Sequence, residues 1–97
     1  MNNVKMELIR NLVENLTVLR AKACLTQEEL GEIVGLSRQS IAMIENSSRK
    51  LSWTNALAII YVFTFNPETA DMLKKLNIVS TDVRHMMEEY CGGKSKC

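Results

Sequence analysis

The sequence predicts an all-α fold, a bundle of five to six helices. Proline occurs once and glycine four times in 97 residues, so residues that break helices are scarce. Apolar residues recur at three- and four-residue spacing in several segments, which is the period of an amphipathic helix. Residues that favour helix N-caps precede most of these segments.

The first predicted helix covers residues 4–23, and its apolar stripe consists of Leu8, Ile9, Leu12, Val13, Leu16, Leu19 and Ala23. Thr26 follows, with Glu29 three residues later, which is the pattern of a capping box. A short second helix should therefore begin here. Its expected buried face consists of Leu30, Ile33 and Val34.

A tight turn at Gly35 should separate the second helix from a third, for which Ser37 is the expected N-cap. Gly31 is costly inside a helix, but its missing side chain would let the third helix cross closely. The small core between the two helices is expected to contain Leu30, Leu36, Ile41 and Ile44. Two short helices joined by such a turn can place the second helix in the major groove of DNA.

The fourth predicted helix covers residues 53–63 and follows a good N-cap residue, Ser52. Residues 59–63 alone resemble a strand, because β-branched and aromatic residues dominate them. We favour a helix, since the whole apolar stretch is long for a strand and no second strand exists to pair with it. Its aromatic residues are expected in the core: Trp53, Tyr61, Phe63 and Phe65.

Asn66 and Pro67 predict the start of a fifth helix, with Met72, Leu73 and Leu76 at core spacing. An extra C-terminal helix is expected at about residues 80–91, with a packing stripe of Val83, Met86, Met87 and Tyr90. Two glycines then favour a flexible tail at 92–97. Residues 1–91 are therefore expected to form a single domain.

Composition excludes several classes of function. The chain is 46% hydrophobic and 24% charged, as in ordinary globular proteins, and too short for a separate catalytic domain. It has no apolar run long enough to span a membrane and no signal-peptide pattern, so we expect a cytoplasmic protein. Three cysteines without CxxC spacing suggest neither a disulfide framework nor a zinc site. We expect no enzymatic activity, no metal and no cofactor.

Residues 26–46, TQEELGEIVGLSRQSIAMIEN, resemble the helix-turn-helix of the phage-repressor, Cro-like or Xre-type transcriptional regulators. The resemblance extends over about residues 16–78 and implies a lambda-repressor-like bundle whose third helix reads DNA. It also implies a phosphate contact at Gln27 and a structural ion pair between Arg20 and Glu45. The positions that it assigns to base reading, or to nearby phosphates and base edges, are Ser37, Arg38, Gln39, Ser40 and Met43.

The chemistry of these side chains suits such roles. Arg38 can donate two parallel hydrogen bonds to guanine, and Gln39 can pair with adenine. Met43 cannot form a hydrogen bond to a base and can only contact a thymine methyl group, so the third helix can recognise only a few base pairs. Arg49 and Lys50 follow the third helix and are placed to contact phosphates, which position a domain without specifying sequence.

The segment departs from the family pattern in two ways. Ser47 stands where the family commonly has glycine, so Asn46 is expected to take the left-handed conformation that ends the third helix. Three acidic residues should lie near the DNA phosphates and weaken binding by one copy: Glu28, Glu29 and Glu32. Because the net charge is only +1, any attraction to DNA must come from the local arrangement of charged side chains.

These observations predict a DNA-binding transcriptional regulator that acts as a homodimer, a repressor that binds double-stranded operator DNA. Extra apolar helix faces beyond the common core motivate the dimer. One alternative is an antitoxin-like or other module whose main partner is a second protein. Another is a purely structural adaptor.

Overall fold

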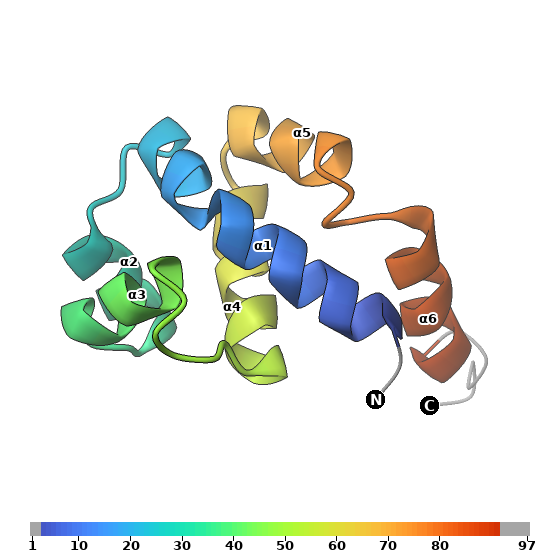
Figure 1. The fold of residues 1–97 in the computed structure, drawn as a ribbon. Helices are drawn as coiled ribbons and strands as arrows, with labels where there is room; N and C mark the ends of the chain where they lie inside the picture. The colour runs from blue at the N-terminus through green and yellow to red at the C-terminus, as the bar shows by residue number, and fades with distance from the viewer. Residues whose placement is uncertain (1–2, 92–97) are drawn as a thin grey trace.

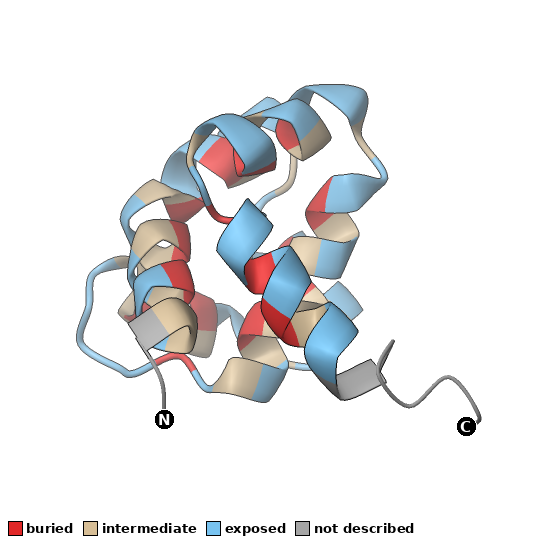
Figure 2. Cartoon of the chain, turned by 90° about the vertical axis from the view of Figure 1, so that its right-hand side faces the viewer, coloured by how far each residue is buried: buried red, intermediate tan, exposed pale blue. Residues whose placement is uncertain are grey.

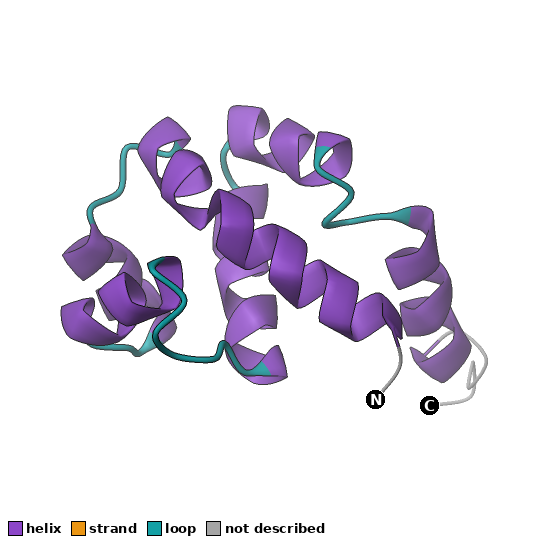
Figure 3. Cartoon of the chain, viewed as in Figure 1, coloured by secondary structure: helices purple, strands orange, loops and turns teal. Residues whose placement is uncertain are grey.

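The computed structural model describes residues 3–91 of the chain. Within this range the chain forms six helices and no strand, which confirms the predicted all-α fold (Figures 1 and 3). The helices are α1 (Asn3–Lys22), α2 (Gln27–Val34), α3 (Arg38–Glu45), α4 (Trp53–Thr64), α5 (Pro67–Lys75) and α6 (Thr81–Cys91). The tail predicted at 92–97 lies outside the described residues, as does the side chain of Tyr90.

The long α1 is the axis of the bundle. It contacts α3, α4, α5 and α6, while α2 packs against α3 and α4. Figure 1 shows the α2–α3 pair at one end of α1 and α6 at the other end. The helix-turn-helix therefore projects from one end of the molecule, far from the C-terminal helix.

The core lies along the inner face of α1, as the buried residues in Figure 2 indicate. Leucines of α1 at positions 8, 12, 16 and 19 are buried, which confirms most of the predicted stripe. They pack with buried residues from every other helix or adjoining loop: Leu30, Ile41, Ile44, Leu51, Ala56, Ile59, Phe63, Leu73, Ile78 and Val83. One continuous core thus holds the helix-turn-helix to the remainder of the bundle.

The apolar fourth segment is a helix, so the strand-like run at 59–63 did not decide its structure. Phe63 is fully buried and Trp53 is half-buried beneath the Lys5 ammonium, which lies 5.1 Å from the centre of its ring. The expectation of core positions for Tyr61 and Phe65 was wrong, because they are 66% and 72% exposed. Tyr61 lies between the buried positions of α4, on the opposite face, and Phe65 follows the last turn of the helix.

The expectation for Ile33 was also wrong, because this side chain is 58% exposed. The buried residues of α2 are Leu30 and Gly31. Burial of Gly31 turns the inner face of the helix toward that residue, and Ile33 lies on the other side of Leu30. An amphipathic pattern treats glycine as neutral, so it misplaces the buried face by about one residue.

Four helices begin at the predicted N-caps. The side chains of Thr26, Ser37, Ser52 and Asn66 each accept a hydrogen bond from a main-chain N–H in the first turn of the following helix. At α2 the capping box is complete, since the Glu29 carboxylate also accepts from the Thr26 N–H at 2.9 Å. These local bonds fix where each helix starts.

Four helices are followed by a residue in the left-handed conformation: Cys24, Gly35, Ser47 and Asn77. Asn46 was expected to take this conformation after α3, but its φ is −95° and that of Ser47 is 64°. The Ser48 N–H donates to the Met43 carbonyl at 2.8 Å, and the Ser47 N–H donates to that of Ile44 at 3.1 Å. These two bonds form a Schellman motif, which places Ser47, one residue beyond Asn46, at the left-handed position.

Ser47→Gly is expected to stabilise the protein by about 0.5 to 1 kcal/mol, because glycine adopts positive φ without the steric cost that serine bears. Urea unfolding followed by circular dichroism measures this gain. Ser48→Gly is the matched control, and it is expected to give no gain because Ser48 is not among the positive-φ residues. Unchanged or lower stability of Ser47→Gly would contradict the strain assigned to this position.

The C-terminal helix packs on its own chain. Val83 and Met86 of α6 are buried, and α6 contacts α1. Two residues of the predicted packing stripe, Val83 and Met86, are therefore covered by this chain and not available to a second copy. Large apolar side chains that do remain exposed lie elsewhere, notably Tyr61 and Phe65, whose rings meet edge to face at 5.0 Å.

Candidate nucleic-acid interface

The turn between α2 and α3 is held by two glycines with different roles. Gly35 has a φ of 80°, which glycine adopts without strain. A Cβ atom on Gly31 would lie 2.4 Å from the main-chain oxygen of Leu36, and the Leu36 N–H donates to the Gly31 carbonyl at 2.8 Å. The close approach predicted at Gly31 is therefore real, but the turn itself makes it and not the body of α3.

The first turn of α3 faces solvent. Ser37, Arg38 and Gln39 are exposed, while Ser40 and Met43 are half-buried. Ile41 and Ile44 are buried on the opposite side, where Leu30 of α2 also lies in the core. The core side chains thus fix α3 in place, and within residues 3–91 nothing buries Arg38 and Gln39 in its polar first turn.

Arg49 folds back onto the start of α3. Its guanidinium donates to the Ser40 hydroxyl, and Ser40 also accepts a hydrogen bond from the Ser37 hydroxyl at 3.0 Å. The Ser40 N–H in turn donates to Ser37 at 3.0 Å. This network holds a positive charge next to Arg38 and Gln39. Lys50, the following residue, is exposed.

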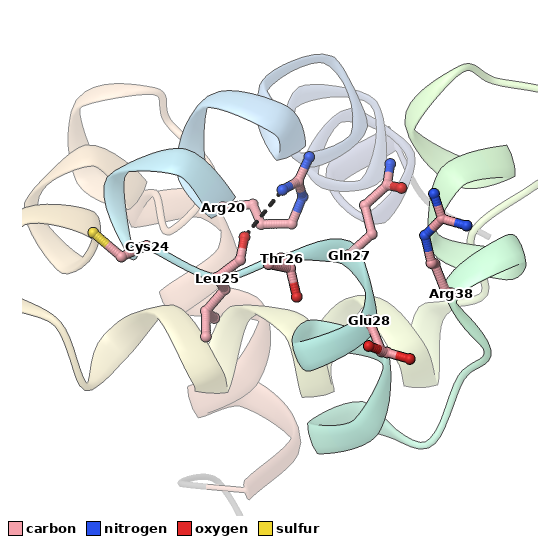
Figure 4. Close-up of a pocket in the computed structure, with 7 residues that line it drawn as sticks. All are labelled: Arg20, Cys24, Leu25, Thr26, Gln27, Glu28 and Arg38. Carbon is pink, nitrogen blue, oxygen red and sulfur yellow. Dashed lines mark hydrogen bonds between the residues drawn. The ribbon is translucent and has the colours of Figure 1, made fainter.

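An ion pair joins α1 to the last residue of α3. The Arg20 Nε lies 2.7 Å from the Glu45 carboxylate, and its Nη2 donates to the same group at 3.2 Å. The side chains are only 17% and 8% exposed. Arg20 Nη1 also donates to the Leu25 carbonyl at 3.0 Å, a bond drawn in Figure 4, so the arginine ties together three parts of the fold.

Four hydrogen bonds converge on the Glu45 carboxylate, since Gln27 and Thr17 donate at 3.0 and 3.1 Å in addition to the two from Arg20. Burial alone would raise the pKa of Glu45, but these donors and the charge of Arg20 outweigh it and lower the pKa. The hydrogen bond to Glu45 raises the pKa of Arg20. Both groups are therefore charged at neutral pH.

Gln27 is oriented by this cluster. Its amide nitrogen donates to Glu45, so this part of the side chain already has a protein partner. Gln27 is also the first residue of α2, where a main-chain N–H lacks an acceptor within the helix. For the phosphate contact that the family resemblance implies at Gln27, the main-chain N–H is therefore better placed than the side-chain amide.

An open hollow of about 600 Å³ separates the starts of α2 and α3 (Figure 4). Figure 4 shows the side chains of Gln27 and Arg38 extending in the same direction beside it. Glu28 also lines the hollow, so a carboxylate borders it together with Arg20 and Arg38. The hollow combines a helix N-terminus with arginine, a combination that suits an anion such as phosphate.

Several contacts of this region were not predicted from the sequence, among them those of Thr17 with Glu45 and of Arg49 with Ser40. Thr17 lies three residues before Arg20 on the same face of α1, and this spacing could have identified it as a second partner of Glu45. The Arg49–Ser40 contact carried no such signal, because it depends on the path of the α3–α4 loop. Among the described residues, no three acidic, histidine or cysteine side chains are placed to hold a metal ion. None of the helices within residues 3–91 is long and apolar enough to cross a membrane.

Comparison with known proteins identifies this region. Residues 18–62 match the model of a protein family described as helix-turn-helix. No curated protein and no solved structure matches the chain. The matched segment runs from the second half of α1 through nearly all of α4, and so contains the turn, the Arg20–Glu45 pair and the exposed start of α3. Residues 18–62 are thus a helix-turn-helix segment of the Xre and lambda-repressor-like type, a family of DNA-binding transcription regulators.

Proposed function

We propose that the protein is a cytoplasmic repressor that binds a specific double-stranded DNA operator through insertion of α3 into the major groove. The observation that carries this proposal is the exposed first turn of α3, where Arg38 and Gln39 project from a helix whose other face is fixed in the core. Both side chains have the hydrogen-bonding groups for bidentate base recognition. The half-buried Met43 can add an apolar contact to a thymine methyl group.

The phosphate contacts are proposed around this turn. Arg49 and Lys50 are exposed on one side of α3, and Arg49 is held there by Ser40. Ser37 is hydrogen-bonded to the same Ser40, and Gln27 at the start of α2 lines the hollow that suits an anion. Contacts to phosphates on both sides of the major groove would then fix how deeply and at what angle α3 enters it. Contacts to the bases would select the sequence.

We further propose that two copies bind a two-fold symmetric operator, with half-site centres about 34 Å apart. Arg38 and Gln39 alone read few base pairs, so a second copy is needed for a longer site. The exposed aromatic pair Tyr61 and Phe65 favours contact with a protein surface. The same pair supports the second candidate function, a module whose main partner is a different protein, as in an antitoxin.

A DNA-binding titration tests the proposal. Operator sequences selected from a random duplex pool are measured by fluorescence anisotropy at several salt concentrations. Arg38→Ala and Gln39→Ala are each expected to weaken operator binding by about 5- to 150-fold, with a much smaller effect on unrelated DNA. Arg49→Ala is expected to weaken binding to all DNA and to reduce the salt slope by about 1.

Arg84→Ala is the matched control, since Arg84 is an exposed arginine of α6, at the opposite end of the bundle from α3. It removes the same charge and is expected to leave operator affinity nearly unchanged. Equal losses of operator affinity in Arg84→Ala and Arg38→Ala would show that the protein binds DNA only through nonspecific charge attraction. No binding of the natural protein to any duplex at low salt would reject the DNA-binding proposal.

A further inference from the structure

A second concave site lies between the first half of α1 and the loop that follows α3. It is a groove of about 540 Å³ lined by Met6, Ile9, Arg10, Val13, Ser47, Arg49, Lys50 and Leu51. Met6 is 58% exposed, although it is a large apolar side chain. The volume falls within the range of about 300 to 1,000 Å³ that is typical of small-molecule sites.

The lining separates into an apolar floor and a cationic rim. Met6, Ile9 and Val13 recur along α1 at helical spacing, and Leu51 closes the groove from the loop. The charged lining residues are Arg10, Arg49 and Lys50, and no acidic residue lines the groove. Glu7 approaches Arg10 only to 3.8 Å, and both side chains are more than half exposed, so this pair neutralises little of the rim.

We propose that this groove binds an amphipathic organic anion, a carboxylate on an unbranched apolar chain. The apolar chain would cover the exposed floor, which duplex DNA cannot do because its backbone is polar and charged. The carboxylate would accept charge-assisted hydrogen bonds from the arginines and the lysine at the rim. Both halves of the ligand are thus specified by the chemistry of the groove.

Binding of this anion would oppose binding of DNA, an inference that rests on the proposed function. Arg49 lines the groove and also donates to Ser40 at the start of α3, so it stands between the two sites. Lys50 is likewise shared between the groove and the proposed phosphate contacts. A carboxylate that engages these two side chains removes them from the DNA and adds a negative charge beside it.

The test uses decanoate, below its micelle concentration, added to the full chain and followed by NMR shifts and calorimetry. Octanoate is expected to bind roughly tenfold more weakly, because two methylenes fewer are buried. Decyltrimethylammonium, with the same chain and the opposite charge, is expected not to bind. Met6→Gln is expected to weaken decanoate binding at least tenfold, whereas Val18→Gln, at another exposed apolar position of α1, leaves it unchanged.

Measurement of operator binding in the presence of decanoate then separates the proposed function from the proposed anion site. Saturating decanoate is expected to weaken operator binding at least tenfold in the natural protein and hardly at all in Met6→Gln. If no DNA binds, the proposed function fails while the decanoate titration still tests the groove. Absence of decanoate binding, equal binding of the cationic analogue, or equal losses in Met6→Gln and Val18→Gln would overturn the site. Binding of an acidic amphipathic peptide in place of decanoate would also overturn it.

Discussion

Gly31→Ala is expected to lower the free energy of unfolding by about 3 kcal/mol, because the new methyl group would overlap a main-chain atom. The nearest atom to an added Cβ is the Leu36 oxygen at 2.4 Å, and that residue's carbonyl carbon lies at 3.3 Å. A flexible side chain could move aside, but this carbonyl belongs to the turn that links α2 to α3. Relief of the overlap therefore requires the two helices to separate.

Urea unfolding at neutral pH measures this loss, with Gly35→Ala as the matched control. A Cβ atom on Gly35 would have no atom within 4 Å, but the residue has a φ of 80°. Its substitution is expected to cost only about 1 kcal/mol, from backbone strain alone. Because the overlap at Gly31 is with the turn, Gly31→Ala is also expected to lose operator binding. Equal stability losses in the two variants would show that the turn absorbs the methyl group.

Helix boundaries were predictable because local hydrogen bonds determine them. Thr26, Ser37, Ser52 and Asn66 cap the following helices through bonds to residues two or three positions away, so the sequence alone contains the signal. The apolar fourth segment was predictable for another reason, since a strand without a partner strand leaves its main chain unbonded.

Residue exposure was less predictable, because it depends on how helices are rotated against one another. Ile33 is exposed because burial of Gly31 rotates α2, and Tyr61 because the core contacts of α4 run through Ile59 and Phe63. The contact between Arg20 and Glu45 spans 25 residues, and only the family resemblance indicated it. The left-handed Ser47 is recognised only from the hydrogen bonds that close α3.

Arg20→Met is expected to lower the free energy of unfolding by about 3 kcal/mol at pH 7, because it leaves the Glu45 carboxylate covered but without its charged partner. Gln27 and Thr17 would still donate to Glu45, yet neither carries a charge. With Arg20 removed, the burial that raises the pKa of Glu45 is no longer outweighed as it is in the natural protein. The pKa of Glu45 should therefore rise in the variant.

The loss should depend on pH in a direction that the pKa of Glu45 determines. In the natural protein this pKa is lowered by folding, so the contribution of Glu45 to stability is present above its unfolded value of about 4.3. The contribution disappears as the pH falls through the lower folded value. Protonated Glu45 needs no cationic partner, so the difference between Arg20→Met and the natural protein should shrink as the pH falls from the raised pKa of Glu45 in the variant to its lowered pKa in the natural protein.

Urea unfolding between pH 7 and pH 3 measures this difference, and Glu45→Gln provides an independent check because it mimics the protonated acid. Its stability should approach that of the natural protein as the pH falls. Glu88→Gln is the matched control, since Glu88 pairs with Arg84 at 3.2 Å on the exposed face of α6. That change is expected to cost less than about 0.5 kcal/mol at pH 7. A loss in Arg20→Met that stayed constant from pH 7 to pH 3 would assign the role of Arg20 to packing of its side chain and not to its charge.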